Sequence, residues 1–264
     1  MNSRPAPFEA LSAAPATSGL VLDFDGVLSP IVDDPGASEL PNRVAWSLAR
    51  LAPTMGLLAV ISGRPVEFLE ERIAIPEIRL LGTYGIEQVH DGIRRVDPGA
   101  KKWLSNVSEA TSALRNLLGA AEGIRVEGKS VSVAVHWRQA PDHRAAADQV
   151  HRVTARIAAE TGLRLEAGKL TEELLPPIDM DKGTALIRLL AAENLTTVAY
   201  AGDDVGDIPA LRAVREAGGY ALVVDHGQET DPLLLELADQ AFAGTDGFAA
   251  WLAELARAVG AAGQ

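Results

Sequence analysis

The chain has 264 residues, of which 47% are hydrophobic, and a formal net charge of −12. This length allows a large buried core in one or two domains. The negative charge and the pI of about 4.9 argue against nucleic-acid binding. The absence of cysteine excludes disulfides, thiolate catalysis and cysteine metal sites. No apolar run approaches the length of a membrane-spanning helix, so we expect no membrane contact and a cytoplasmic protein.

The first 18 residues are rich in alanine, proline and serine. They lack the basic region and the following apolar stretch of a signal peptide. Residues 1–18 are therefore predicted to be a disordered tail.

The first element with chemical content is an apolar run that ends in two aspartates. Residues 20–22 predict a strand that is buried on both faces, as in a parallel sheet. Asp23 and Asp25 are two residues apart on an extended segment, so their side chains point to the same side. Gly26 allows a sharp turn there. Two adjacent carboxylates repel each other unless a cation lies between them, although aspartates are also common in ordinary turns.

A second apolar strand, residues 56–61, ends in Ser62, Gly63 and Arg64. A hydroxyl and backbone amides at a strand-to-helix turn can donate hydrogen bonds to a phosphate. The same residues also fit an ordinary helix start, with Pro65 in the first turn. Both interpretations can hold for the same residues.

The third signal is a lysine at the start of a helix. Lys182 precedes an amphipathic segment, residues 184–192. A lysine in the first helical turn is unfavourable beside the positive end of the helix dipole. It therefore indicates an anionic partner, although a solvated surface lysine is the simpler alternative.

The fourth signal is an acidic cluster after a third apolar strand, residues 197–201. Asp203, Asp204 and Asp207 follow within a few residues. Carboxylates gathered at the end of a buried strand are costly without a cation, and hard oxygen ligands suit Mg²⁺. A solvated acidic loop does not explain why the cluster follows a buried strand.

Short strands alternate with helices on both sides of a middle region of different character. We expect an α/β fold with a Rossmann-like, doubly wound parallel sheet built from residues 19–88 and 178–264. Residues 89–177 are expected to form an inserted α+β cap domain, consisting of two strand pairs and two helices, over the catalytic edge of the sheet.

Four segments define the expected cap. Helical spacing predicts helices over residues 101–119 and 145–161. Alternation over residues 130–138 predicts a half-buried strand, and residues 163–175 predict a hairpin. Asp91–Gly92 is a further hairpin signal.

The polar face of the expected cap carries charged side chains. His136 and Arg138 share one strand face, beside a turn that contains Glu127 and Lys129. Carboxylates accept hydrogen bonds from sugar hydroxyls, while lysine and arginine donate to hydroxyls or phosphate. A solvated sheet face is the alternative interpretation.

The four strand-end signals, in this order, resemble the four-motif signature of the haloacid dehalogenase superfamily of phosphatases. Over about residues 20–247 the chain is also similar to the trehalose-6-phosphate phosphatase family. The segments that carry this similarity are residues 25–35, 82–87, 127–129, 136–138 and 168–173.

The resemblance implies a role for each matching residue. Asp23 would be the nucleophile and Asp25 the acid and base, with Lys182 as a further catalytic group. Asp23, Asp25 and Asp203 would bind Mg²⁺, while Asp204 and Asp207 would support the metal site or orient Lys182. Ser62, Gly63 and Lys182 would bind the phosphate. The substrate-binding residues would be Arg64, Glu127, Lys129, His136, Arg138, Lys169 and Glu173.

Four positions depart from the pattern of the family. Val27 stands where the family usually has threonine, Tyr84 where it has histidine, and Ile208 where it has an acidic residue. Leu175 replaces the arginine of a Glu-x-Arg-Pro run. The loss of a cation near the sugar phosphate puts the identity of the substrate in question more than the type of reaction.

The sequence thus predicts an enzyme that hydrolyses trehalose 6-phosphate with Mg²⁺ through an aspartyl-phosphate. The alternatives are a phosphatase for another sugar phosphate, such as a glucosylglycerol, sucrose or mannosyl-glycerate ester, and a non-catalytic homologue that regulates a synthase. The resemblance also implies a trehalose-phosphate synthase as a candidate partner. A phospho-acceptor receiver does not fit the long insertion between Ser62 and Lys182.

Overall fold

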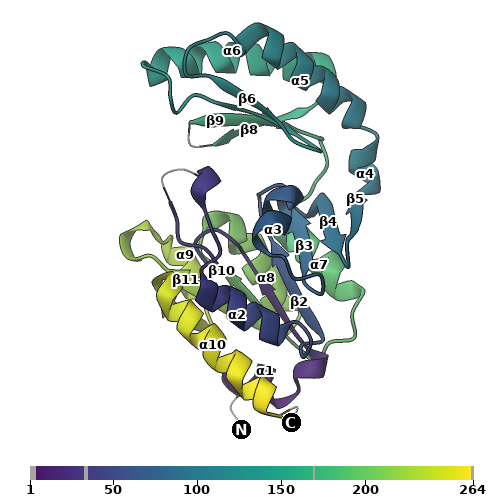
Figure 1. Cartoon of the computed structure of the whole chain (residues 1–264), viewed down its shortest axis with the longest axis vertical. Coiled ribbons are helices and arrows are strands. Elements are labelled where there is room, and N and C mark those ends of the chain that lie inside the picture. Colours follow the sequence, from purple (N-terminus) through teal and green to yellow (C-terminus); the bar gives the residue numbers. More distant parts are fainter. Residues whose placement is uncertain (1–3, 33–34, 169, 263–264) are drawn as a thin grey trace. The chain divides into compact units, whose positions relative to one another are not determined.

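The computed structural model describes residues 4–32, 35–168 and 170–262, which form two compact units (Figure 1). The core unit comprises residues 1–95 and 180–264, and the inserted unit comprises residues 96–179. None of the helices in the described part of the chain is both long and apolar enough to cross a membrane.

The core unit is built on an eight-stranded sheet with the order β12-β11-β10-β1-β2-β3-β4-β5. The pairs from β12 to β3 are parallel, and β4 runs antiparallel to β3. The expected doubly wound sheet is therefore confirmed. Its strands are β1 (Ser18–Leu22), β2 (Leu57–Ile61), β3 (Arg79–Gly82), β4 (Glu87–His90), β5 (Ile93–Val96), β10 (Thr197–Gly202), β11 (Tyr220–Asp225) and β12 (Gln240–Ala243).

Helices cover both faces of this sheet (Figure 1). One face packs on α1 (Pro7–Ala13), α2 (Asn42–Leu51), α3 (Val66–Arg72) and α10 (Gly244–Ala262) through a continuous apolar cluster. The other face carries α7 (Lys182–Ala191) and α8 (Ile208–Glu216), which pack against each other, while α9 (Pro232–Leu237) lies against α8. Because both faces are covered, β1 and β2 are buried along their whole lengths.

The strand register gathers the predicted motifs at one edge. β1 lies between β10 and β2, with Leu22 opposite both Ala201 and Val60. Parallel strands in register end at the same edge, where open α/β sheets bind their ligands. The segments that follow β1, β2 and β10 therefore meet there.

The inserted unit is a four-stranded antiparallel sheet, in the order β6-β7-β9-β8, packed against helices. Val131, Val133, Val135 and Trp137 are buried, as their alternation predicts. Its elements are α4 (Pro98–Lys101), α5 (Leu104–Leu118), β6 (Arg125–Gly128), β7 (Val133–His136), α6 (His143–Thr161), β8 (Arg164–Gly168) and β9 (Thr171–Leu175).

The prediction of a disordered N-terminal tail is wrong for the described residues from Arg4 onward. Leu11 of α1 is fully buried in the main apolar cluster, and Phe8 packs edge-on against Trp251. The Arg4 guanidinium lies 3.6 Å from the ring centroid of Tyr220. Although the segment is rich in alanine and proline, Phe8 and Leu11 lie one helical turn apart, and these two apolar side chains are enough to anchor it.

Two predicted details of the inserted unit also differ from the structure. The hairpin at Asp91–Gly92 joins β4 and β5, which extend the large sheet of the core unit. Glu127 lies within strand β6 and not in a turn. A hairpin signal is local, so it cannot specify which sheet the hairpin joins.

Candidate active site

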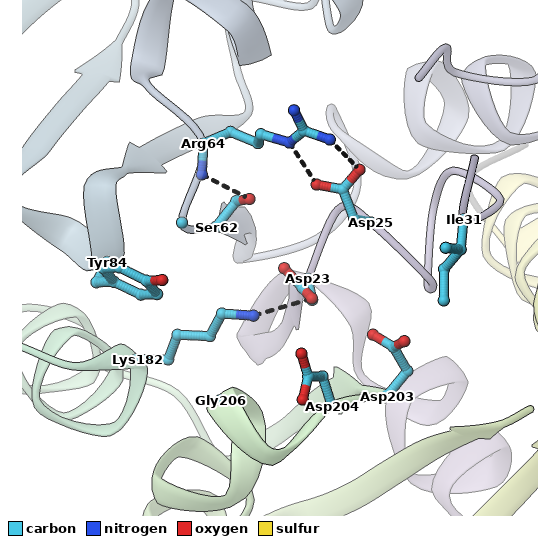
Figure 2. A pocket seen from close by; sticks show the side chains of 11 residues that line it. Asp23, Asp25, Ile31, Ser62, Arg64, Tyr84, Lys182, Asp203, Asp204 and Gly206 are labelled. Atoms are coloured by element: carbon cyan, nitrogen blue, oxygen red, sulfur yellow. Dashed lines mark hydrogen bonds and ion pairs between the residues drawn. The ribbon is translucent and has the colours of Figure 1, made fainter. Parts of the chain in front are cut away.

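A pocket of about 350 Å³ opens among the segments that follow β1, β2, β3 and β10 in the core unit (Figure 2). Its size is suited to a small ligand. The residues that line it are Asp23, Asp25, Ile31, Ser62, Gly63, Arg64, Tyr84, Lys182, Asp203, Asp204 and Gly206.

The centre of the site is a buried ammonium group. Lys182, the first residue of α7, places its Nζ 2.9 Å from Asp23 Oδ2 and 2.7 Å from Asp207 Oδ1. All three side chains are buried. Burial favours the neutral amine, but the carboxylates of Asp207 and Asp23 hold the pKa of Lys182 above its ordinary value. The anionic partner that the sequence indicates for this lysine is therefore a pair of carboxylates from the chain itself.

Asp207 uses both of its carboxylate oxygens within the protein. Oδ1 also accepts a hydrogen bond from Tyr200 Oη at 2.6 Å. Oδ2 accepts from the backbone amides of Asp203, at 3.0 Å, and Asp204, at 3.1 Å. These bonds fix the carboxylate against Lys182, and they fold the loop after β10 around it. Asp207 does not line the pocket.

Asp23 and Asp203 crowd the same small volume. Carboxylate oxygens of Asp23, Asp203 and Asp207 lie within 4.8 Å of one another. Burial, followed by the charge of Asp207, raises the pKa of Asp23 to about 7 although Lys182 opposes the shift. Burial and the charges of Asp23 and Asp207 raise the pKa of Asp203 to about 8. One ammonium therefore faces three carboxylates.

The donor set fits a divalent cation. Asp203 Oδ1 is buried and has no hydrogen-bond partner in the described part of the chain. A buried carboxylate oxygen without a donor is costly, whereas a hard cation such as Mg²⁺ prefers this kind of ligand. Because the oxygens of Asp207 are already occupied, Asp23 and Asp203 are the carboxylates that could hold the ion.

A histidine that the sequence analysis missed lies behind this carboxylate pair. His226 Nε2 lies 3.0 Å from the carbonyl oxygen of Gly26, to which it donates as the NεH tautomer, and 3.4 Å from Asp203 Oδ2. A Cβ on Gly26 would lie 1.9 Å from the same Oδ2, so only glycine fits there. The sequence could have indicated this histidine, because His226 directly follows strand β11, and β11 is the neighbour of β10 in the sheet.

Asp25 lies at another side of the pocket, where it pairs with Arg64 (Figure 2). Arg64 Nε and Nη2 donate to the two carboxylate oxygens at 2.6 and 2.8 Å, and Ser38 Oγ donates at 3.0 Å. The guanidinium lies 4.4 Å from the ring centroid of Phe68. Ser62 Oγ accepts a hydrogen bond from the Arg64 amide at 3.1 Å, as expected for a turn at the start of a helix.

The inserted unit brings a second group of predicted residues together. Ala134 of β7 lies opposite Glu127 of β6 and Glu173 of β9, so both carboxylates share one sheet face. Lys129 Nζ donates to Glu173 Oε1 at 2.8 Å, and His136 Nε2 lies 2.8 Å from Glu127 Oε2. The hydrogen bond with His136 and the charge of Lys129 outweigh burial and lower the pKa of Glu127 to about 2.

Asp204, Arg138, Lys169 and Leu175 complete the positions that the sequence analysis singled out. Asp204 is exposed at the pocket wall, and Arg138 is exposed in the turn after β7. Lys169 lies outside the described residues. Leu175 is fully buried at the end of β9, so an arginine at this position would be a buried charge.

Comparisons with known proteins address the family and the fold. The model of the trehalose-phosphatase family matches residues 21–232. A trehalose-phosphate phosphatase of Mycobacterium marinum is 33% identical over 240 residues, which cover 84% of this chain and 60% of that protein. The chain thus spans less than two thirds of the length of this relative.

Two solved structures share the fold. A protein described as related to trehalose-6-phosphate phosphatase superposes with a TM-score of 0.77 at 21% identity, over 93% of this chain and 100% of its own. A haloacid dehalogenase-like hydrolase from Bacteroides thetaiotaomicron gives 0.62 at 16% identity, over 90% and 99%. The fold is thus that of haloacid dehalogenase-like hydrolases. Because the family model matches most of the length of this chain, the chain belongs to the trehalose-phosphatase family.

Proposed function

We propose that this protein is a sugar-phosphate phosphatase, with trehalose 6-phosphate as the first candidate substrate. The observation that carries the proposal is the buried Lys182 ammonium beside Asp23 in a pocket at the carboxyl edge of the sheet. A fixed cation next to a carboxylate nucleophile is the arrangement that transfer of a dianionic phosphoryl group requires. Membership of the trehalose-phosphatase family supports the choice of substrate class.

The reaction would proceed in two displacements at phosphorus. A carboxylate oxygen of Asp23 attacks the phosphorus atom, and the bond from phosphorus to the sugar oxygen breaks. Asp25 gives its proton to the departing sugar oxygen. Asp25 then takes a proton from water, whose oxygen attacks the aspartyl-phosphate and releases inorganic phosphate. Asp23 is regenerated.

The phosphoryl oxygens would be held by groups that already surround the pocket. Lys182 supplies a full positive charge, while Ser62 supplies a hydroxyl and Gly63 a backbone amide. Arg64 is engaged by Asp25 in this structure. A bound phosphate would compete with Asp25 for the guanidinium, which would leave the Asp25 carboxyl available for proton transfer.

Mg²⁺ would be held by the carboxylates of Asp23 and Asp203 and by the backbone carbonyl of Asp25. When bound, it would neutralise negative charge on the transferred phosphoryl group. The unpartnered Asp203 Oδ1 and the raised pKa values of Asp23 and Asp203 support a cation at this place.

The sugar would be recognised by the polar face of the inserted unit, which we propose acts as the cap. Glu127 and Glu173 are acceptors for sugar hydroxyls, and Lys129 is a donor beside them. Leu175 supports the second candidate, a phosphatase for a different sugar phosphate, because the arginine that the family resemblance implies is absent at this position. A non-catalytic regulator would have no reason to keep costly buried carboxylates around Lys182.

Asp23→Asn should abolish release of phosphate from every ester tested while the protein stays folded, because an amide cannot act as the nucleophile. The measurement is phosphate release from trehalose 6-phosphate, sucrose 6-phosphate, glucosylglycerol phosphate, a mannosyl-glycerate ester and p-nitrophenyl phosphate. Asp231→Asn is the matched control, because Asp231 caps α9 and asparagine caps a helix equally well. Turnover by Asp23→Asn at the rate of the wild type would refute the mechanism.

Metal removal should change thermal stability in a pH-dependent way. The folded-state pKa values of Asp23 and Asp203, about 7 and about 8, exceed the ordinary value of 3.8. The metal-free folded state therefore binds protons more tightly than the unfolded chain, so stability is lost as the pH rises from about 4 to about 8. Since Mg²⁺ competes with these protons, it should raise the Tm of chelator-treated protein more at about pH 8 than at about pH 6.

Circular-dichroism melts at the two pH values measure this effect, with Asp203→Asn as the comparison. Loss of the Asp203 charge should remove most of the Tm increase that Mg²⁺ produces. The same Tm increase at both pH values, or an undiminished response in Asp203→Asn, would contradict the assignment of the metal site.

Lys129→Ala and Glu173→Ala should each lower kcat/KM for the true sugar phosphate by about one to two orders of magnitude, the cost of a charge-assisted hydrogen bond. Neither should alter hydrolysis of p-nitrophenyl phosphate, which has no sugar to bind. Glu160→Ala, on the exposed side of α6, controls for general effects on the inserted unit. Equal losses of kcat/KM for the sugar phosphate and for p-nitrophenyl phosphate would show that these residues do not bind the sugar.

A further inference from the structure

The turn between β3 and β4 places a tyrosine at the pocket in an unusual backbone conformation. Thr83 and Tyr84 have φ values of 49° and 58°, and Gly85 follows at 94°. Residues other than glycine rarely adopt positive φ, and for a β-branched threonine this is a real outlier. The other two such residues in the described part of the chain, Asp91 and Leu170, lie in hairpin turns and do not line the pocket.

Hydrogen bonds to the neighbouring strand end impose this conformation. The Thr83 amide donates to the carbonyl oxygen of Arg64 at 2.8 Å, and the Tyr84 amide donates to that of Ser62 at 2.9 Å. Thr83 Oγ1 donates to Glu87 at 3.2 Å, and both of these side chains are buried. The turn is therefore fixed to the Ser62–Arg64 segment, whose groups we propose bind the phosphoryl oxygens.

The hydroxyl end of the Tyr84 side chain lies over the backbone of that segment. A Cβ on Gly63 would lie 3.0 Å from both Cζ and Oη of Tyr84. Figure 2 shows the ring on the wall of the pocket, on the same side as Ser62 and Lys182. The side chain is only partly buried, so one side of it faces the pocket.

A role in packing alone does not explain this residue. Glycine holds a left-handed turn without strain, and asparagine does so with little. The chain instead keeps a large hydroxylated ring in a strained conformation at the pocket wall, and strained backbone that the surroundings impose is concentrated at ligand-binding positions.

We propose that Tyr84 binds the phosphoryl group of the substrate, with its phenol hydroxyl donating a hydrogen bond to a phosphoryl oxygen between Ser62 and Lys182. The inference rests on the proposed function, because it assigns a further contact in the same site. A phenol hydroxyl can donate a hydrogen bond to a phosphoryl oxygen. A histidine at this position could also donate a hydrogen bond, but its charge would change near neutrality.

Tyr84→Phe removes only the hydroxyl and keeps the ring, so the fold should be retained. We expect the Kd for inorganic phosphate, measured by calorimetry in excess Mg²⁺, to rise about tenfold or more. KM for trehalose 6-phosphate and for p-nitrophenyl phosphate should rise by similar factors, because both substrates carry the phosphoryl group. Tyr84→His should recover most of the affinity for phosphate and make it depend on pH near neutrality.

Tyr220→Phe is the matched control, because it removes a hydroxyl that donates to Pro5 O, at a residue that does not line the pocket. Phosphate binding by Tyr84→Phe as tight as that of the wild type would overturn the inference while leaving the proposed function intact. A loss confined to the sugar ester would also overturn it, since Tyr84 would then contact the leaving group. If the wild type neither binds phosphate nor hydrolyses any ester, the proposed function itself fails, and this inference fails with it.

Discussion

A single buried ammonium group between two carboxylates organises the edge of the core sheet at which the pocket lies. Lys182 lies within 2.9 Å of both Asp23 and Asp207, and none of the three side chains is more than slightly exposed. Burying charges costs several kcal/mol per ion, which is recovered only when the geometry is good and the remaining lone pairs are satisfied. Asp207 meets this condition through Tyr200 and two backbone amides. Removing Lys182 would leave buried carboxylates without a compensating positive charge, so the stability of this edge depends on the same contacts as the proposed chemistry.

The charge balance around Lys182 determines what else the site needs. Three carboxylates face one ammonium, and Asp207 has no oxygen to spare. Asp23 and Asp203 remain, with raised pKa values and with one buried oxygen of Asp203 unpartnered. A divalent cation would relieve this repulsion, and a phosphoryl group would then find positive charge on two sides. A metal at this place and the lysine would therefore have the same physical role, because together they would convert an acidic strand edge into a binding site for an anion.

Much of the core site could be predicted from the sequence because parallel strands end at one edge. The apolar runs before Asp23, Ser62 and Asp203 identify three strands, and their register brings these residues together. The remaining features depend on tertiary contacts. The anchoring of the N-terminal helix by Leu11 is hidden by an alanine-rich composition, and the left-handed conformation of Tyr84 arises from hydrogen bonds to another strand end. A short hairpin signal such as Asp91–Gly92 likewise does not indicate which sheet the hairpin joins.

We propose distinct roles for the two aspartates, with Asp203 binding the metal and Asp207 acting through Lys182. Calorimetric titration of Mg²⁺ into Asp203→Asn and Asp207→Asn, each confirmed as folded by circular dichroism, tests these roles directly. The account predicts that Asp203→Asn loses Mg²⁺ binding, whereas Asp207→Asn still binds one Mg²⁺ per chain although its turnover is lost, because Lys182 is no longer held beside Asp23. Loss of Mg²⁺ binding in Asp207→Asn with retention in Asp203→Asn would contradict the account.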